Sequence, residues 1–367
     1  MGGSIKMKRL ILCCDGTWNS ADQMHEEIPC PTNVVRIAYR IAKHDDGVKQ
    51  IIYYGQGVGT GNSLDRITGG AFGRGVEDNI FDAYRFLIAN YEPGDEVYLF
   101  GFSRGAFTAR SIAGMIRKCG ILCREHVLHY RKTIELYRSD ESPDMERPVE
   151  FRSNYSVDRE KPILIQFIGV WDTVGALGIP LRGLRNLTKR KHQFHDTELS
   201  GSVKTACHAL AIDEKRSPFK PTLWQYKPKE GQTVEQMWFP GVHSNVGGGY
   251  PDRSLADISL EWMIGRAKLA GLKFDEKVES VQELSPIPAG KIYNSKKGLY
   301  KFSRGYDRVI GVSEKRIREE GTTVQGDDPT QFIHQSVLDR WDQDPTYRPP
   351  GLLNYFKKVN DTRVDNL

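Results

Sequence analysis

A serine lies between two glycines in the stretch YLFGFSRGAFTAR, residues 98–110. Gly101, Ser103 and Gly105 fit the pattern G-x-S-x-G, in which a serine hydroxyl serves as the nucleophile of acyl transfer. An apolar, strand-like run ends just before the motif, and a helix-like run begins just after it. A nucleophile elbow requires this strand–turn–helix context, so Ser103 is the candidate nucleophile. The alternative is an ordinary serine at the start of a helix.

A nucleophilic serine needs a base and an acid that orients the base, and after such an elbow the chain order is acid, then histidine. Asp172 directly follows the apolar run ILIQFIGVW and precedes a glycine-containing loop, the expected place for the acid. The alternative is an aspartate that only caps a turn. His243 follows the strand-like run VEQMWFPGV and is the candidate base. His334 is the rival base, or else a residue that shapes the site.

An oxyanion at the substrate carbonyl needs two N–H donors. One is expected to be the amide of Arg104, the residue after the nucleophile. The other should come from the loop after an earlier strand, where the stretch CCDGTWN offers the amide of Gly16 or Thr17. Asp15 precedes these two residues, and we expect it to shape the site.

Short apolar strands alternate with amphipathic helical runs over the first half of the chain, which is typical of βαβ units. Strands are predicted at KRLILCC, VKQIIYYG, DEVYLFG, KPILIQFIGVW and VEQMWFPGV, and helices at PTNVVRIAYRIAKH, VEDNIFDAYRFLIANY, AFTARSIAGMIRK, TELSGSVKTACHALAIDE and SLADISLEWMIGRAKLAG. His208 falls in the fourth helix and is interpreted as a core histidine. The sequence thus predicts an α/β fold, with a mainly parallel central sheet flanked by helices like that of an α/β-hydrolase.

The order of these elements also suggests how the chain is divided. Residues 1–7 are interpreted as a disordered start, and residues 8–250 as an α/β-hydrolase core with helical insertions. Beyond them the pattern loosens, and residues 251–367 are expected to form a cap or peripheral helical elements packed on the same domain. With 367 residues, the chain can bury a large core without disulfides.

Charge and composition narrow the range of partners. The formal net charge is only +5 and most basic residues are dispersed, so nucleic acid is not an expected partner. No apolar run reaches the roughly 18 residues that a membrane helix needs, and no secretory signal is recognisable. The six cysteines fit a reducing compartment, and we expect a cytoplasmic protein as synthesised, with export open only to a route that needs no signal peptide. Composition does not predict the oligomeric state.

One basic cluster stands apart. Residues 181–194, LRGLRNLTKRKHQF, carry five basic residues and no acidic one. One interpretation is peripheral contact with an anionic membrane surface. The other is a solvated loop, which is what such charge runs usually are.

Two further patterns resemble ligand sites but lack the required spacing or context. Cys119, Cys123, His126 and His129 could share a helix face and hold zinc, but Gly120 interrupts that helix. The glycine-rich stretches GQGVGTG and GGAFGRG match no nucleotide-binding loop. We therefore predict neither a metal nor a cofactor.

Seven motifs together carry a family resemblance: CCDGTWN, YYGQGVGTG, GDEVYLFGFSRGAFTAR, FIGVWDTVGALG, HALAIDEKRSPFKPTLW, WFPGVHSNVGGGY and IHQSVLDRW. In order and wording they resemble the uncharacterised α/β-hydrolase domain family that includes the first class of type VI secretion lipase effectors. The resemblance covers roughly residues 8 to 350. It implies an α/β-hydrolase core with Ser103, Asp172 and His243 as the triad. Asn245 stands where the family more often has Asp.

The resemblance also implies a substrate. Effectors of this family are similar to phospholipases that cleave acyl esters of membrane lipids, so we expect a serine esterase or lipase acting through an acyl-enzyme, with an ester or phospholipid as substrate. The same triad also serves thioesters and amides, so a thioesterase or amidase is the alternative. A non-catalytic interaction module with a vestigial triad is the second alternative.

Overall fold

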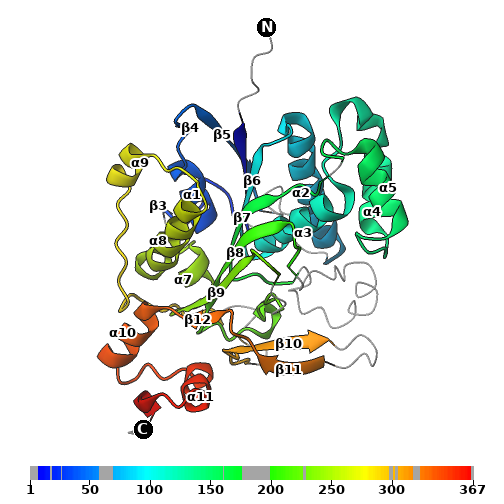
Figure 1. Ribbon diagram of the computed structural model, residues 1–367. Coiled ribbons are helices and arrows are strands. Elements are labelled where there is room, and N and C mark those ends of the chain that lie inside the picture. The colour runs from blue at the N-terminus through cyan, green and yellow to red at the C-terminus, as the bar shows by residue number, and fades with distance from the viewer. Residues whose placement is uncertain are drawn as a thin grey trace.

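The computed structural model describes residues 7–16, 19–25, 27–57, 69–159, 161–175, 199–225, 229–296, 301, 305–316 and 323–364. Its centre is an eight-stranded sheet (Figure 1). The strand order is β12 (Gln331–Ile333), β9 (Thr233–Phe239), β8 (Val203–Ala211), β7 (Ile165–Trp171), β6 (Glu96–Phe102), β1 (Lys8–Cys14), β5 (Val48–Gly55) and β4 (His44–Asp45). All neighbouring pairs are parallel except β4 with β5, so the predicted α/β fold with a mainly parallel sheet is confirmed.

One face of the sheet is covered by four helices. They are α2 (Gly69–Asn90), α3 (Arg104–Cys119), α4 (Tyr130–Arg138) and α5 (Glu146–Tyr155), all on the same side in Figure 1. Leu10 and Leu99 of the sheet pack there against Ile80 of α2 and Ile112 of α3. Alternate residues of the same strands point the other way, because side chains along a strand alternate between faces.

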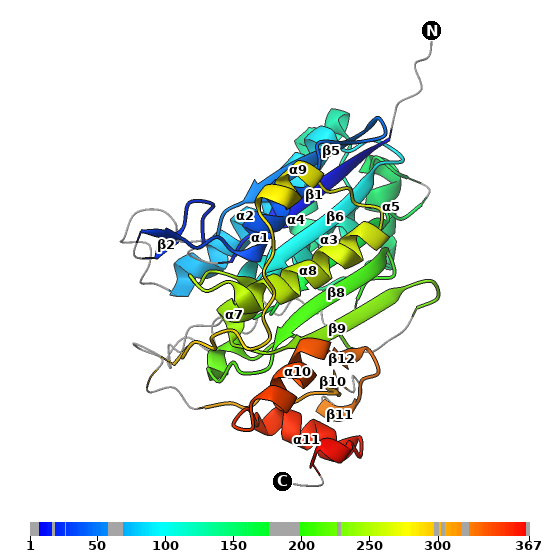
Figure 2. The same cartoon turned by 90° about the vertical axis from the view of Figure 1, so that its left-hand side faces the viewer.

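The opposite face is covered by α1 (Asn33–Arg40) and α8 (Ser254–Leu269), which lie in front of the sheet in Figure 2. Ile11 and Phe100 pack there against Ile37 of α1 and Met263 of α8. Thr32 caps α1, because its side chain accepts the Val35 amide hydrogen. Two short helices complete this side, α7 (His243–Gly247) and α9 (Glu276–Val281).

The C-terminal part of the chain extends the sheet and packs beside its β9 edge. Strand β12 pairs with β9, and α10 (Gln335–Gln343) and α11 (Pro350–Lys358) bury Trp341 and Phe356 against Trp238. A separate hairpin consists of β10 (Val312–Arg316) and β11 (Thr323–Asp327). The remaining short elements are β2 (Met24–His25), β3 (Ile28–Pro29), η1 (Arg124–His129), η2 (Ser217–Phe219) and η4 (Thr362–Val364). The expected division at residue 250, with a cap beyond it, stays a prediction.

One element differs from the sequence prediction. The helix predicted over TELSGSVKTACHALAIDE is wrong, because Val203–Ala211 form strand β8 between β7 and β9. Its last six residues are all buried, so the segment shows a continuous apolar run instead of strand alternation. His208 therefore lies in a central strand, where it is fully buried as predicted.

The cysteines and the length and hydrophobicity of the helices can be stated for the described residues as a whole. All six cysteines are free thiols and buried. Within the described ranges, no helix combines the length and the apolar character needed to cross a bilayer.

Candidate active site

Ser103 occupies a sharp turn between strand β6 and helix α3. Its backbone angles are φ 57° and ψ −120°, a conformation that non-glycine residues rarely adopt. The turn is tight: a Cβ atom on Gly105 would lie 2.1 Å from the Cys14 carbonyl oxygen, and one on Gly101 would lie 2.4 Å from the Gly105 carbonyl oxygen. The two glycines therefore allow the start of α3 to pack against the end of β1. Strain at a serine in this position is typical of a nucleophile elbow.

Asp172 occupies the equivalent position after the neighbouring strand. Phe102 and Trp171 are paired across β6 and β7, so the residues that follow them emerge side by side at the carboxyl edge of the sheet. The Ser103 amide donates to the Trp171 carbonyl at 3.0 Å, which ties the two turns together. Asp172 has φ 37°, a left-handed conformation that aspartate tolerates better than most residues, and its side chain is fully buried.

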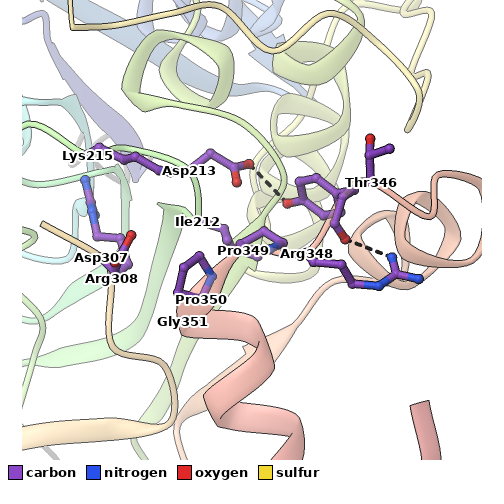
Figure 3. A pocket seen from close by; sticks show the side chains of 11 residues that line it. Ile212, Asp213, Lys215, Asp307, Arg308, Thr346, Arg348, Pro349, Pro350 and Gly351 are labelled. Atoms are coloured by element: carbon purple, nitrogen blue, oxygen red, sulfur yellow. Dashed lines mark hydrogen bonds between the residues drawn. The ribbon is translucent and has the colours of Figure 1, made fainter. Parts of the chain in front are cut away.

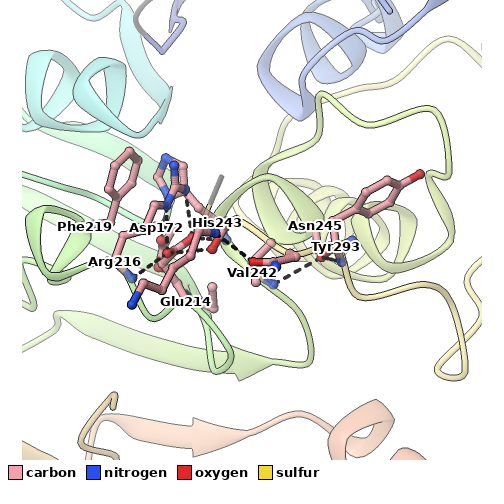
Figure 4. Close-up of polar contacts among 12 residues, drawn as sticks. Asp172, Glu214, Arg216, Phe219, Val242, His243, Asn245 and Tyr293 are labelled. Atoms are coloured by element: carbon pink, nitrogen blue, oxygen red, sulfur yellow. Dashed lines mark hydrogen bonds and ion pairs between the residues drawn. The ribbon is translucent and has the colours of Figure 1, made fainter. Parts of the chain in front are cut away.

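His243 begins helix α7, and its Nδ1 lies 2.6 Å from Asp172 Oδ2 (Figure 4). Its ring also packs on that of Phe102, with centroids 4.6 Å apart, which places the imidazole beside the residue that precedes Ser103. Gly247 makes this packing possible, since a Cβ atom there would lie 2.0 Å from the Phe102 ring. The structure thus brings His243 and Asp172 into contact at the elbow.

The surroundings of this pair shift both of its pKa values downwards. Burial would raise the pKa of Asp172, but the nearby Arg308 cation and the bond to His243 outweigh that effect and hold the pKa well below its ordinary value. Burial lowers the pKa of His243, and this outweighs the attraction of Asp172 for a proton on the ring. An ionised carboxylate therefore faces a neutral imidazole.

Arg308 is a partner of Asp172 that the sequence did not reveal. Its Nη1 donates to Asp172 Oδ1 and its Nη2 to Asp172 Oδ2, both at 3.0 Å, and both side chains are fully buried. The residue lies in the stretch YDRVIGV, far along the chain and outside every recognised motif. No pattern in the sequence could have indicated it, because a lone arginine in a loop has no distinctive spacing.

A second, partly buried ion pair supports His243 from the loop after β8. Glu214 accepts from the Arg216 side chain at 2.9 and 2.8 Å, and its Oε2 lies 3.3 Å from the His243 amide nitrogen (Figure 4). Arg216 also lies over the Phe219 ring at 3.6 Å, and that ring meets the imidazole edge to face at 4.9 Å. These residues fall in the motif HALAIDEKRSPFKPTLW, although no role could be assigned to them from the sequence alone.

The Asn245 side chain holds a loop together. Its Oδ1 accepts the amide hydrogens of Val242 and Tyr293, both at 3.2 Å, and its Nδ2 donates to the Lys291 carbonyl at 2.9 Å. An amide can do both at once, whereas an aspartate could only accept. Asn245 therefore links the start of α7 to residues 291–293.

The predicted oxyanion donors have different surroundings. Arg104 opens helix α3, so its amide lies in the turn whose N–H groups point out of the helix end. The Gly16 N–H donates instead to Asp15 Oδ1 at 2.7 Å, so in this conformation it is directed away from an oxyanion. Thr17 lies outside the described residues.

Asp15 itself is buried beside the elbow. Its Oδ2 accepts from Thr32 at 2.7 Å and from Tyr54 at 2.8 Å. Burial raises the pKa of Asp15 to about 6 against the opposing effect of these bonds. A Cβ atom added to Gly16 would lie 3.2 Å from Ser103 Cβ, so the Asp15 loop is adjacent to the serine.

The other two histidines considered are engaged elsewhere. His334 caps helix α10: its Nδ1 lies 2.9 Å from Ser336 Oγ, and its ring packs on Phe239 with centroids 4.7 Å apart. His208 Nε2 accepts the Thr173 amide hydrogen at 3.0 Å, which fixes the backbone just after Asp172. The structure thus brings His243, and neither of these histidines, onto the Asp172 carboxylate.

The basic cluster and the Cys/His pattern are the two remaining candidate sites from the sequence. The basic cluster 181–194 lies outside the described residues. Cys119 is buried, and its Sγ lies 3.6 Å from the Thr133 carbonyl oxygen. In the part of the chain that the structure describes, no group of three His, Cys, Asp or Glu side chains could hold a metal ion.

The chain is similar to a known protein family and to a curated relative. Residues 8–266 match the family model described as type VI secretion system (T6SS), phospholipase effector Tle1-like, catalytic domain. An uncharacterised protein of Saccharomyces cerevisiae, YEL023C, is 32% identical over 248 residues, which cover 60% of this chain and 34% of that protein. The chain therefore spans about a third of the length of this relative.

Two solved structures are similar at lower identity. One is the crystal structure of an uncharacterised protein from Pseudomonas aeruginosa, with a TM-score of 0.46, 19% identity, and coverage of 76% of this chain and 49% of that one. The other is a Tle1 effector bound to the VgrG spike of the type VI secretion system, with a TM-score of 0.39, 21% identity, and coverage of 67% and 52%.

Proposed function

The chain belongs to the family of Tle1-like type VI secretion phospholipase effectors, within their catalytic domain, and from this membership we propose that it is a serine hydrolase of carboxylic esters. The observation that carries the proposal is the 2.6 Å contact between His243 Nδ1 and Asp172 Oδ2 beside the strained elbow of Ser103. Acyl esters of phospholipids are the proposed substrate, on the strength of the family description.

In the proposed mechanism, Asp172 holds the imidazole as the tautomer with hydrogen on Nδ1, which leaves Nε2 free to accept a proton. His243 removes the hydroxyl proton of Ser103 as the serine oxygen attacks the ester carbonyl. The imidazolium then gives that proton to the departing alcohol, and an acyl-enzyme remains. Water, deprotonated by His243, attacks the acyl-enzyme, and Ser103 is regenerated with release of the carboxylic acid.

Two N–H groups would stabilise the oxyanion in each half-reaction. The Arg104 amide is the proposed first donor, since it lies at the start of α3 next to the nucleophile. We propose that the second donor comes from the loop after β1, through Gly16 or Thr17; in this conformation the Gly16 amide bonds to Asp15.

A fluorophosphonate probe tests the nucleophile directly, because such probes form a covalent bond with activated serines. We expect the wild-type protein to be labelled, mass spectrometry to map the adduct to Ser103, and the Ser103→Ala and His243→Ala variants to remain unlabelled. Labelling at any other residue, or equal labelling of His243→Ala, would contradict the proposed triad. Hydrolysis of phospholipid vesicles compared with short-chain esters then tests the substrate class.

Activity is expected to persist into mildly acidic solution. His243 acts as a base only when neutral, so protonating it abolishes activity, and burial lowers its pKa below the ordinary 6.5. The acid side of the kcat/KM profile should therefore reach half its maximum below pH 6.5. A midpoint above that value, on a protein still folded by circular dichroism, would contradict a buried imidazole base.

A further inference from the structure

We propose that Arg308 is a positioning residue of this site, fixing the Asp172 carboxylate and thereby the orientation and basicity of the His243 imidazole. That Arg308 matters for catalysis rests on the proposed function. That it positions Asp172 rests on geometry alone, because two parallel N–H···O bonds at 3.0 Å fix both carboxylate oxygens in one plane.

The contacts of Asp172 leave the carboxylate little freedom. Oδ1 accepts from Arg308 Nη1 and from the Ala211 amide at 3.1 Å. Oδ2 accepts from Arg308 Nη2 and faces His243 Nδ1. Without Arg308, the carboxylate would keep one bond on each oxygen and could rotate about its Cβ–Cγ bond. The oxygen that faces the imidazole would then be held by that contact alone.

Arg308 is itself held firmly. Its Nη2 also donates to the Phe219 carbonyl at 2.8 Å, and its Nε lies 3.4 Å from the Glu214 carbonyl oxygen. Glu214 and Phe219 also contact His243, through its amide and its ring respectively. One guanidinium group therefore links the acid to the loop that surrounds the base.

The charge of Arg308 has a predictable effect on His243. The imidazole faces Asp172 from the loop after β7 and Glu214 and Arg216 from the loop after β8. Arg308 adds a positive charge on the other side of Asp172, and His208 is a further ionisable group near that carboxylate. Removing the Arg308 charge strengthens the pull of Asp172 on the imidazolium, so the pKa of His243 should rise.

A cavity offers a way to test this role chemically. It has a volume of about 210 Å³, and Arg308 lines it together with Asp213 and Lys215 (Figure 3). Because Arg308 both lines this cavity and contacts Asp172, shortening the side chain would open a path from the cavity to the carboxylate. Guanidinium ion could then occupy the vacated position.

The experiment compares wild type with Arg308→Ala and Arg308→Lys. We expect Arg308→Ala to slow fluorophosphonate labelling of Ser103 by about 100-fold, the typical cost of a misplaced catalytic group. NMR titration should show the pKa of His243 raised above its wild-type value. Guanidinium chloride at sub-denaturing concentration should restore labelling, whereas tetramethylammonium chloride should not. Arg308→Lys keeps the charge without the paired bonds, so it should keep the wild-type pKa of His243 but label slowly.

Arg36→Lys is the matched control. Arg36 pairs with Asp257 in another buried ion pair, between α1 and α8, so its replacement reports the general cost of disturbing such a pair. The thermal unfolding temperature should be lower in Arg36→Lys and in the two Arg308 variants than in wild type. Only the Arg308 variants should label Ser103 more slowly.

Four outcomes would decide the inference. An unchanged titration curve of His243 in folded Arg308→Ala would overturn it. A fractional loss of Ser103 labelling no larger than the fraction of unfolded protein would also overturn it. If Arg308→Ala does not fold, wild-type labelling rates in Arg308→Lys would overturn it instead. If His243 titrates as expected but wild type is never labelled, the positioning role stands and the proposed function fails.

Discussion

Replacing Ser103 with alanine is expected to reduce ester hydrolysis by about 10⁴- to 10⁶-fold while leaving the fold intact. The loss is large because alanine cannot form the acyl-enzyme, so only substrate binding and oxyanion stabilisation remain to accelerate attack by water. The Ser103 side chain also does not cap helix α3, since it makes no capping hydrogen bond to that helix. Single-turnover kinetics with a chromogenic ester would measure the effect.

Ser111→Ala is the matched control for this variant. Ser111 is a buried serine in the same helix, and its separation of eight residues from Ser103 corresponds to roughly 12 Å along the axis. We expect this control to keep wild-type turnover. Ser103→Ala activity within tenfold of wild type would show that another residue is the nucleophile.

Asp172→Asn is expected to lower kcat by about 10⁴-fold, because an amide favours the wrong imidazole tautomer. The same change should also lower the free energy of unfolding by about 3–5 kcal/mol, because it leaves the Arg308 cation buried without its counter-charge. The two losses have different origins, the first in the proton on Nδ1 and the second in the buried guanidinium. Steady-state kinetics and urea denaturation measure them separately.

Asp257→Asn separates these two effects. It breaks the buried pair with Arg36, so a comparable loss of stability is expected, with little change in kcat. If Asp172→Asn were destabilised to the same extent but remained as active as Asp257→Asn, Asp172 would have no role in orienting the base.

The sheet could be predicted from the sequence because its central strands are buried on both faces. LILCC and FIGVW are continuous apolar runs, and they lie in β1 and β7. Strand β8 was missed because Val203–Ala211 is rich in alanine, the strongest helix former, and only its place between two strands decides its conformation. The intrinsic preference of alanine favours a helix there, whereas pairing with the two neighbouring strands favours a strand, and the strand forms.

The candidate site was predictable only where residues follow recognisable elements. Ser103, Asp172 and His243 each come just after a strand, so their positions could be inferred from the strands alone. The bond from the Gly16 amide to Asp15 was not visible, because it depends on a side-chain rotamer. Arg308 was not visible either, since its contact with Asp172 joins residues 136 positions apart.

The contact between Arg308 and Asp172 affects how a minimal fragment of this protein would be designed. The family match ends at residue 266, and a fragment cut there would retain the serine, the aspartate and the histidine. It would lose Arg308, the Tyr293 amide that bonds Asn245, and edge strand β12. The Asp172 carboxylate would then lose the cation that bonds to both of its oxygens. The segments that carry Tyr293 and Arg308 thus belong to the proposed site, and we expect that an exchange of C-terminal segments between relatives must preserve an arginine at this position.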